Sequence, residues 1–267
     1  MSALVDSLNH PLAGEIRNLL SRATRPTGSI LIDDEENILQ ARKAGVAVRA
    51  IFMVSGLSPA FAAALPQGVP VHTVAPRTCK KLFGADRVSR VFAIADTPQS
   101  LSLSAFAARA ADIVVLDGLS ITGNIGAIVR TSVALGVQGI IVLGLPYADV
   151  FDRRIIRSSR GHVFGIPVVA SSRDDLVPFA KEYGYTTLAC SAVAERAIEQ
   201  SPALAHKRLA VIFGSEKQGC DPALAAQADF QARIPMNGAV ESLNVSAAAS
   251  IILYQRRLHQ LGASPLP

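Results

Sequence analysis

Short apolar runs alternate with amphipathic stretches along the first third of the chain and predict a small α/β domain. In order, we expect a helix near 11–22, a strand GSILID (28–33), a helix opened by Asp33 and Asp34, a strand VRAIFMV (48–54), a strand VPVHTV (69–74) and a helix PRTCKKLFG (76–84). Pro76 suits a helix start, because its missing N–H is not needed in the first turn.

β-branched runs recur through the rest of the chain and predict a mostly parallel sheet with helices on both faces. The six expected strands are DIVVLDG (112–118), QGIIVLG (138–144), GIPVVA (165–170), YTTLAC (185–190), RLAVIFG (208–214) and FQARIP (230–235). The closing segment 243–262 carries its charges only late, so we expect a largely buried helix whose last turns face water.

The polar segment 96–104 lacks apolar periodicity and marks the boundary between the two halves. The fold class is therefore α/β, with a small domain at 1–95, a linker at 96–110 and a larger domain at 111–267.

Half of the 267 residues are apolar, enough for a sizeable core, and the mean hydropathy is +0.34. No apolar run approaches the roughly 18 residues of a membrane span, and the first residues lack a basic region followed by an apolar core. We therefore expect a soluble cytoplasmic protein without membrane contact.

Cys79, Cys190 and Cys220 are widely spaced without nearby histidines, so neither a disulfide framework nor a metal site is expected.

The net charge of +5 and the isoelectric point near 9.4 suit a polyanionic partner. The excess gathers in two stretches. These are Arg77, Lys80, Lys81, Arg87 and Arg90, and then Arg153, Arg154, Arg157 and Arg160.

The first candidate site is the loop and helix start at 117–130, directly after a strand. Loops at the carboxyl ends of parallel strands are where α/β sheets bind ligands. Asn124 and Arg130 share a flank of the helix only if its first turn is irregular, which the neighbouring glycines allow. In the alternative, Asn124 caps the helix and Arg130 forms a surface ion pair.

The second candidate site is FGSEKQG (213–219), again after an apolar strand. Gly214 allows close approach to a ligand, and Gly219 accepts a positive φ. Ser215 and Glu216 supply polar groups. A phosphate-binding loop is disfavoured, because the Gly-x-x-x-x-Gly-Lys-Ser/Thr pattern is absent and an acid would repel phosphate. An ordinary strand-to-helix turn is the alternative.

The third candidate site is IPMNGAVESLNVS (234–246), where Pro235 stops a strand and the last helix begins. Either Ser242 or Asn244 caps that helix while its free N–H groups face a ligand. Capping alone would explain Ser242. It would not explain three polar or glycine-bearing loops at strand ends in the same half of the chain.

Together these segments resemble the SpoU branch of the knotted RNA methyltransferases. The matching motifs, in the family's order, are Asn-x-Gly-x-x-x-Arg at Asn124, Gly126 and Arg130, Phe-Gly-Ser-Glu-x-x-Gly at 213–219, and Ile-Pro-Met with Glu-Ser-Leu-Asn-Val-Ser at 234–236 and 241–246. Within the branch, segments 82–95, 123–136 and 152–169 are similar to the thiostrepton-resistance type of 23S rRNA methyltransferase. The chain departs from that pattern at both ends, at 144–151 and at 190–206.

The resemblance implies a trefoil-knot methyltransferase domain at 111–267, a ribosomal-protein-like RNA-binding domain at 1–95, the cofactor S-adenosylmethionine, a 23S rRNA partner and a homodimer. The implied cofactor-binding residues are Leu188, Cys190, Gly214, Ser215, Glu216, Ile234, Met236, Ser242, Leu243 and Asn244. The implied catalytic residues are Arg130, Asn124, Glu216, Ser242 and Asn244. The implied RNA-binding residues are Arg77, Lys80, Lys81, Arg87, Arg90 and Arg160.

Methyl transfer to a ribose hydroxyl needs in-line approach and loss of the hydroxyl proton, so positioning should dominate catalysis. A guanidinium with a pKa above about 12 is a poor base, so we expect Arg130 to bind a phosphate of the RNA. The group that removes the proton of the ribose hydroxyl is not assigned. Arg160 supports either the methionine carboxylate or the RNA. Phe83 either stacks on a splayed base or lies in the core.

Two alternatives remain, one of another class of protein and one within the same class of enzyme. A noncatalytic RNA-binding protein that keeps this fold would fail to bind S-adenosylmethionine, and a tRNA ribose methyltransferase would differ in its substrate. A nicotinamide-dependent oxidoreductase is disfavoured, because Gly-x-Gly-x-x-Gly is absent after the first strand of the sheet. The target nucleotide and any antibiotic are not encoded in these patterns.

Overall fold

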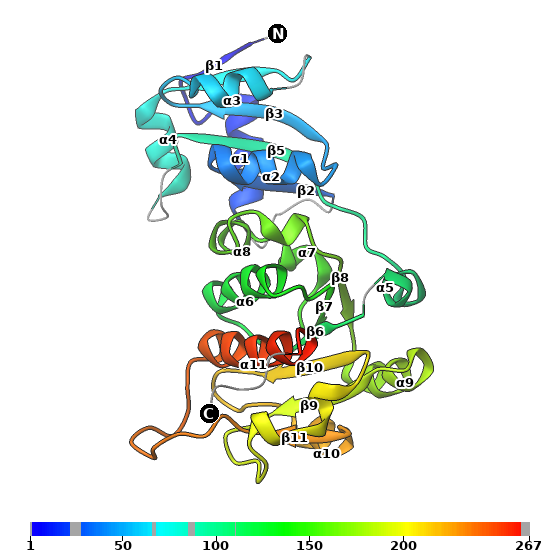
Figure 1. The fold of residues 1–267 in the computed structure, drawn as a ribbon. Coiled ribbons are helices and arrows are strands. Elements are labelled where there is room, and N and C mark those ends of the chain that lie inside the picture. The colour runs from blue at the N-terminus through cyan, green and yellow to red at the C-terminus, as the bar shows by residue number, and fades with distance from the viewer. Residues whose placement is uncertain (1, 22–27, 66–67, 85–88, 110, 263–267) are drawn as a thin grey trace. The chain divides into compact units, whose positions relative to one another are not determined.

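The computed structural model describes residues 2–21, 28–65, 68–84, 89–109 and 111–262, which divide into two compact units (Figure 1). The first comprises Met1–Gln99 and Phe151–Gly165, and the second Ser100–Val150 and Ile166–Pro267. The first unit is thus discontinuous in sequence, although the sequence division assigns 151–165 to the second domain. No helix in the described part is long and apolar enough to cross a membrane.

A five-stranded mixed sheet forms the centre of the first unit, in the order β1-β4-β3-β5-β2. Its strands are β1 (Leu4–Val5), β2 (Ser29–Asp33), β3 (Val48–Met53), β4 (Val71–Val74) and β5 (Val91–Asp96), and its helices are α1 (Pro11–Leu20), α2 (Glu35–Lys43), α3 (Pro59–Ala64) and α4 (Pro76–Phe83). β5 runs antiparallel between β2 and β3 and pairs Phe92 with Phe52, whose rings stack with centroids 5.1 Å apart. The predicted elements are present, but Asp33 ends β2 and does not open α2, and the N-cap residue Asp34 makes no side-chain capping hydrogen bond. Strands β1 and β5 and helix α3 were not predicted.

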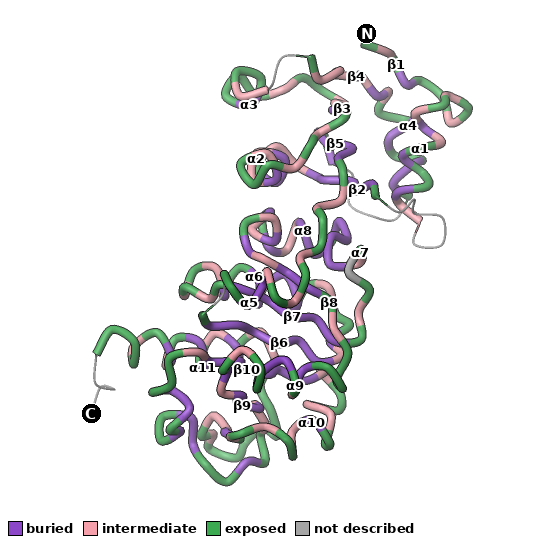
Figure 2. Tube along the Cα trace, turned by 90° about the vertical axis from the view of Figure 1, so that its right-hand side faces the viewer, coloured by how far each residue is buried: buried purple, intermediate pink, exposed green. Residues whose placement is uncertain are grey.

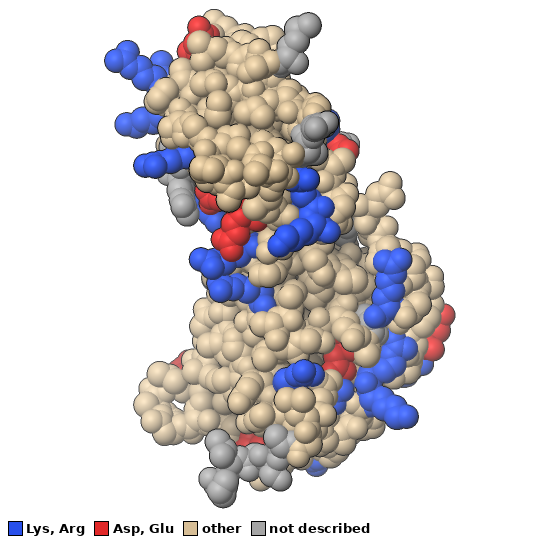
Figure 3. Space-filling view, turned by 45° about the horizontal axis from the view of Figure 1, so that its top comes forward, with Lys and Arg blue, Asp and Glu red and all other residues tan. Residues whose placement is uncertain are grey.

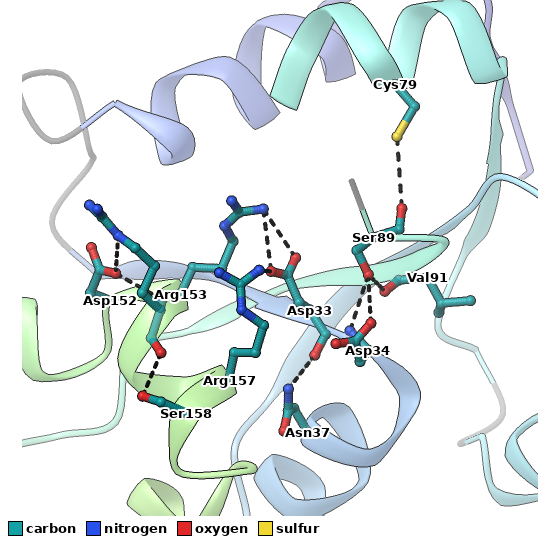
Figure 4. A network of polar contacts seen from close by, with 11 residues as sticks. Asp33, Asp34, Asn37, Cys79, Ser89, Val91, Asp152, Arg153, Arg157 and Ser158 are labelled. Carbon is teal, nitrogen blue, oxygen red and sulfur yellow. Dashed lines mark hydrogen bonds and ion pairs between the residues drawn. The ribbon is translucent and has the colours of Figure 1, made fainter. Parts of the chain in front are cut away.

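The segment Phe151–Gly165 is held to the first unit by a buried carboxylate (Figure 4). In α8 (Arg153–Ser158), the Nη1 atoms of Arg153 and Arg157 lie 3.3 Å and 3.5 Å from Oδ2 of Asp33. Burial raises the pKa of Asp33 to about 6, although the two arginines oppose the shift. Two of the four arginines of the second basic stretch are therefore structural. Their guanidinium groups compensate a buried charge instead of facing an external polyanion.

The second unit has six parallel strands in the order β11-β9-β10-β6-β7-β8, as the apolar runs predict. They are β6 (Ile113–Asp117), β7 (Gly139–Leu143), β8 (Val168–Ser171), β9 (Thr186–Cys190), β10 (Leu209–Gly214) and β11 (Phe230–Ala232). The helices are α5 (Leu103–Arg109), α6 (Thr122–Ala134), α7 (Tyr147–Val150), α9 (Arg173–Tyr183), α10 (Pro222–Gln227) and α11 (Val245–Gln260), with 3-10 turns η2 (Ile198–Gln200) and η3 (Pro202–Ala205).

Both faces of this sheet are covered, and its central strands β6, β7 and β10 are buried along their whole length (Figure 2). Phe106 of α5, Phe179 of α9 and Leu224 of α10 pack in one cluster with Ile113 and Val115 of β6. Helices α6 and α11 pack against each other on the other side of the sheet (Figure 1). Because side chains of a strand alternate between faces, these three strands need apolar residues throughout, which explains their continuous apolar runs.

The last helix is less buried than predicted, since its buried residues are only Ala249, Ile252, Leu253 and Arg256. Arg257 and His259 in its last turns are exposed, as predicted, and Arg256 is the exception. Arg256 is buried and forms a two-pronged ion pair with Asp112, with Nε 2.7 Å from Oδ2 and Nη2 2.9 Å from Oδ1. Asp112 also accepts hydrogen bonds from Gln260 Nε2 and the backbone N–H of Leu209. Removing one partner of such a buried pair costs about 3–5 kcal/mol, so this charge fixes α11 to the sheet.

Candidate active site

The loop after β10 folds back tightly on the end of its own strand. Ser215 and Gly219 exchange two backbone hydrogen bonds of 2.9 and 3.0 Å, and Gly219 has the expected positive φ of 71°. A Cβ on Gly214 would lie 1.9 Å from both Cys220 N and Gly219 C. Gly214 is therefore required by the close approach of the Gly219–Cys220 peptide, a constraint that the sequence did not reveal.

Asp117 supports the end of this loop from the neighbouring strand β6. Its Oδ1 lies 2.6 Å from Arg173 Nε, and its Oδ2 accepts a 2.8 Å hydrogen bond from the backbone N–H of Asp221. Asp221 in turn caps α10. Sequence reasoning assigned Asp117 no role. The available signal was an acid at the end of an otherwise apolar strand, which must be paired when it is buried.

Asn124 joins the three loops that the sequence singled out. Its Nδ2 donates a 2.8 Å hydrogen bond to Glu216 Oε1, and its Oδ1 accepts a 3.1 Å hydrogen bond from Asn244 Nδ2. Asn124 is 8% exposed and lies inside α6, whose N-cap residue is Ile121. The alternative that Asn124 caps the helix is therefore wrong.

Glu216 is held as a carboxylate at this junction. Burial favours its neutral form, but hydrogen bonds from the Asn124 side chain and from backbone N–H groups, including that of Ile121, outweigh it. The pKa of Glu216 is therefore lowered below its ordinary value. At neutral pH Glu216 is therefore negatively charged, and its carboxylate holds the loops together through these hydrogen bonds.

The structure also decides which of Ser242 and Asn244 caps the N-terminus of α11. Asn244 is the N-cap residue, and its Oδ1 accepts a 2.9 Å hydrogen bond from the backbone N–H of Ser246. One amide side chain thus caps α11 with its oxygen and holds Asn124 with its nitrogen. Ser242 is exposed in the preceding loop.

These loops surround a cavity of about 830 Å³ at the carboxyl ends of β9, β10 and β11. Its walls are both apolar and polar. Most of the predicted cofactor-binding residues line it, namely Cys190, Gly214, Ser215, Glu216, Ile234, Met236, Ser242, Leu243 and Asn244. Leu188 does not line it and lies two residues before the carboxyl end of β9. Phe213, Cys220 and Arg233 line it without having been predicted.

Cys220 lies against the back of the cavity with its thiol turned toward backbone carbonyls. Its Sγ lies 3.6 Å from both Cys190 O and Ile212 O. Burial raises the pKa of the Cys220 thiol to about 11, and burial also raises that of Cys190. Both thiols are therefore protonated and suited to packing. Among the described residues, no cluster of histidine, cysteine or acidic side chains could hold a metal ion.

Arg130 lies apart from its predicted catalytic companions. The helix α6 is continuous from Thr122, and a spacing of six residues places the side chains of Asn124 and Arg130 about 120° apart. Arg130 is exposed and does not line the cavity, and its side chain has no hydrogen bond or ion pair with another described residue. Among the described residues, the alternative of a surface ion pair is therefore not supported.

The residues predicted to bind RNA lie in the first unit. Arg77, Lys80, Lys81 and Arg90 are exposed, while Arg87 falls outside the described residues. Arg160 is also exposed, with its Nη1 3.9 Å from Glu36 Oε1, and it does not line the cavity. Phe83 is 4% exposed, packs edge-on against Phe92 and lies under the Arg153 guanidinium, so its core interpretation is confirmed.

A parallel sheet with a mixed apolar and polar cavity at its strand ends defines an α/β protein that binds a small organic ligand. Residues 112–254 match the SpoU rRNA methylase family, and residues 2–109 match the family described as thiostrepton-resistance methylase, N terminus. The chain belongs to the SpoU rRNA methylase family.

Relatives of nearly the same length support this assignment. The chain is 33% identical over 264 residues to the 23S rRNA (adenosine(1067)-2'-O)-methyltransferase of Streptomyces laurentii, covering 98% of this chain and 97% of that one. It is 34% identical over 271 residues to the enzyme of the same name from Streptomyces azureus, with 97% and 98% covered. The crystal structure of an AdoMet-bound rRNA methyltransferase from Sinorhizobium meliloti superposes with a TM-score of 0.83 at 26% identity, covering 97% and 98%.

Proposed function

We propose that this protein transfers a methyl group from S-adenosylmethionine to a ribose 2'-hydroxyl in structured 23S rRNA. The observation that carries the proposal is the hydrogen-bonded junction of Glu216, Asn124 and Asn244, which links the three family motifs beside one cavity. The whole-length similarity to 23S rRNA methyltransferases favours rRNA over tRNA as substrate. Because that substrate is ribosomal, we place the activity in the cytoplasm.

The residues around the cavity suit this cofactor. About 830 Å³ falls within the range of roughly 300–1,000 Å³ typical of small-molecule sites. Ile234 and Leu243 offer apolar surface for an adenine ring, and Ser215 and Ser242 offer polar groups for the ribose and the amino acid. When bound, S-adenosylmethionine supplies a methyl group on a sulfonium that is already an excellent leaving group.

The protein's own contribution is then to position the ribose hydroxyl. Asn124 and Asn244 fix the loops beside the reacting atoms, and Arg130 clamps a phosphate of the RNA. Neither Arg130 nor Glu216 is suited to remove the ribose proton. A guanidinium is a poor base, and the lowered pKa of Glu216 together with its hydrogen bonds makes its carboxylate a weak one.

The decisive experiment is to map the methylated ribose after incubating purified protein with S-adenosylmethionine and deproteinised 23S rRNA or tRNA. A single modified ribose in 23S rRNA supports the proposal. Modification of tRNA alone would reassign the substrate. RNA binding without any binding of labelled S-adenosylmethionine would identify a noncatalytic RNA-binding protein.

We further propose that the active protein is a homodimer in which Arg130 serves the partner's cavity. One face of α11 leaves Ile251 and Tyr254 exposed, 38% and 53%, and these two side chains, three residues apart, offer adjacent apolar surface to a partner. Thr131 and Ser250, the chain neighbours of Arg130 and Ile251, lie 3.4 Å apart, hydroxyl to hydroxyl. Arg130 therefore lies on the same helix pair as this apolar face.

Light scattering is expected to give twice the chain mass at assay concentration. Tyr254→Glu with Ile251→Glu should shift the protein to monomers and abolish transfer, because two charges cannot be buried in an apolar interface without partners. An active monomer of either protein would contradict the proposal.

The first unit presents a basic helix face that we assign to RNA. In α4, Arg77, Lys80 and Lys81 are exposed while Cys79 and Leu82 are buried, and basic side chains project from the flank of this unit (Figure 3). This spacing places the three charges on one side of the helix. Phosphates bound there would release counterions, which makes the affinity for RNA depend on salt.

Lys80→Ala with Lys81→Ala is expected to weaken RNA binding and spare the affinity for S-adenosylmethionine. Each lost phosphate contact flattens the plot of log affinity against log salt by about 0.7–0.9, so the double variant should lose between about one and two units of slope. Lys181→Ala with Lys207→Ala, which removes two exposed lysines of the second unit, is the charge-matched control. Equal salt slopes for both double variants would show that the lysines of α4 make no specific contribution to RNA binding.

A further inference from the structure

One wall of the cavity comes from the segment 191–197, which joins β9 to η2. Ser191, Ala192 and Val193 line the cavity. This segment lies within the stretch 190–206 and outside the three family motifs. The family motifs therefore do not explain what holds this wall in place.

Backbone hydrogen bonds fix the two ends of the wall to β11 and the residue after it. Ser191 N–H donates to Ala232 O at 3.0 Å, and Arg233 N–H donates to Arg196 O at 2.9 Å. The N–H of Ile198 donates to Arg233 O at 2.8 Å. The residues between these anchors bulge outward, and Val193 is 90% exposed.

The side chain of Arg233 holds the middle of this bulge. Its Nη1 donates to Ala194 O at 2.6 Å and also to Glu195 O. Arg233 is half-buried and lines the cavity beside the segment that it binds. Hydrogen bonds from an ionised donor are stronger than neutral ones, so the guanidinium fixes the peptide planes of residues 194 and 195.

We propose that Arg233 is a positioning residue for the cofactor. It preorganises the wall 191–193 through the carbonyls of Ala194 and Glu195, without itself reacting. A wall that is ordered before binding spares the ligand the entropic cost of ordering it, which raises affinity. The inference rests on the proposed function, because it assigns S-adenosylmethionine to this cavity.

The test compares Arg233→Met, Arg233→Lys and a matched control, Arg208→Met. Arg208 also binds backbone carbonyls, at 2.9 Å from Tyr183 O and 2.6 Å from Ala107 O, but it does not line the cavity. Calorimetry should give an affinity for S-adenosylmethionine about tenfold weaker in Arg233→Met, a loss of about 1.4 kcal/mol. Arg233→Lys should recover part of it, and Arg208→Met should bind as wild type.

In transfer assays, Arg233→Met should raise KM for S-adenosylmethionine and leave kcat at saturating cofactor unchanged. Equal cofactor affinity in Arg233→Met and wild type would overturn the inference, as would an equal loss in Arg208→Met, which would indicate general destabilisation. A wild-type chain that binds no S-adenosylmethionine would instead overturn the proposed function.

Discussion

Replacing Arg130 with alanine is expected to slow methyl transfer at least about a hundredfold while changing the affinity for S-adenosylmethionine by less than about twofold. Arg130 is exposed and does not line the cavity of its own chain, so its loss leaves the cofactor walls intact. We assign it instead to an RNA phosphate next to the target ribose. A misplaced ribose loses in-line approach to the methyl group, which explains the large expected effect on rate.

Single-turnover transfer and calorimetry with S-adenosylmethionine measure the two quantities separately. Arg130→Lys keeps the charge but loses the two-pronged geometry, so it should recover only part of the rate. Mixing Arg130→Ala with Asn124→Ala should restore activity in mixed dimers, because one site then combines an intact cavity with an intact Arg130. A collapse of cofactor affinity in Arg130→Ala would move this residue to the cofactor site.

Gly214→Ala is expected to destabilise the protein by about 3 kcal/mol or more and to abolish measurable cofactor binding. The new methyl group would lie 1.9 Å from Cys220 N and 2.2 Å from Gly219 O, both backbone atoms. Neither a rotamer change nor a small shift relieves such a contact, so the loop 215–219 must move. Glu216, which holds Asn124, moves with it.

Denaturant unfolding gives the stability, and calorimetry gives the cofactor affinity. Gly14→Ala is the control, since Gly14 lies in α1, where an added Cβ would meet no neighbouring atom within 4 Å, and alanine favours a helix. Its stability should match or exceed that of wild type. Normal cofactor binding by Gly214→Ala would indicate that the loop after β10 is free to move and does not shape the cavity.

The sequence by itself determined the fold class, the six strands of the second unit and the three loops of the site. Strands buried on both faces need continuous apolar runs, and loops that follow parallel strands gather at one edge of the sheet, so both features are encoded locally. The motifs containing Asn124, Glu216 and Asn244 also carried the family resemblance.

Tertiary structure decided the roles of residues whose partners are distant in sequence. Arg153 and Asp33 are 120 residues apart, and Arg256 and Asp112 are 144 apart. The sequence around these arginines therefore does not distinguish them from arginines that face solvent. The steric need for Gly214 was hidden for the same reason, because only the folded loop brings the Gly219–Cys220 peptide against it. A charge or a glycine in a sequence does not specify its partner, and the partner decides whether it binds a ligand or stabilises the fold.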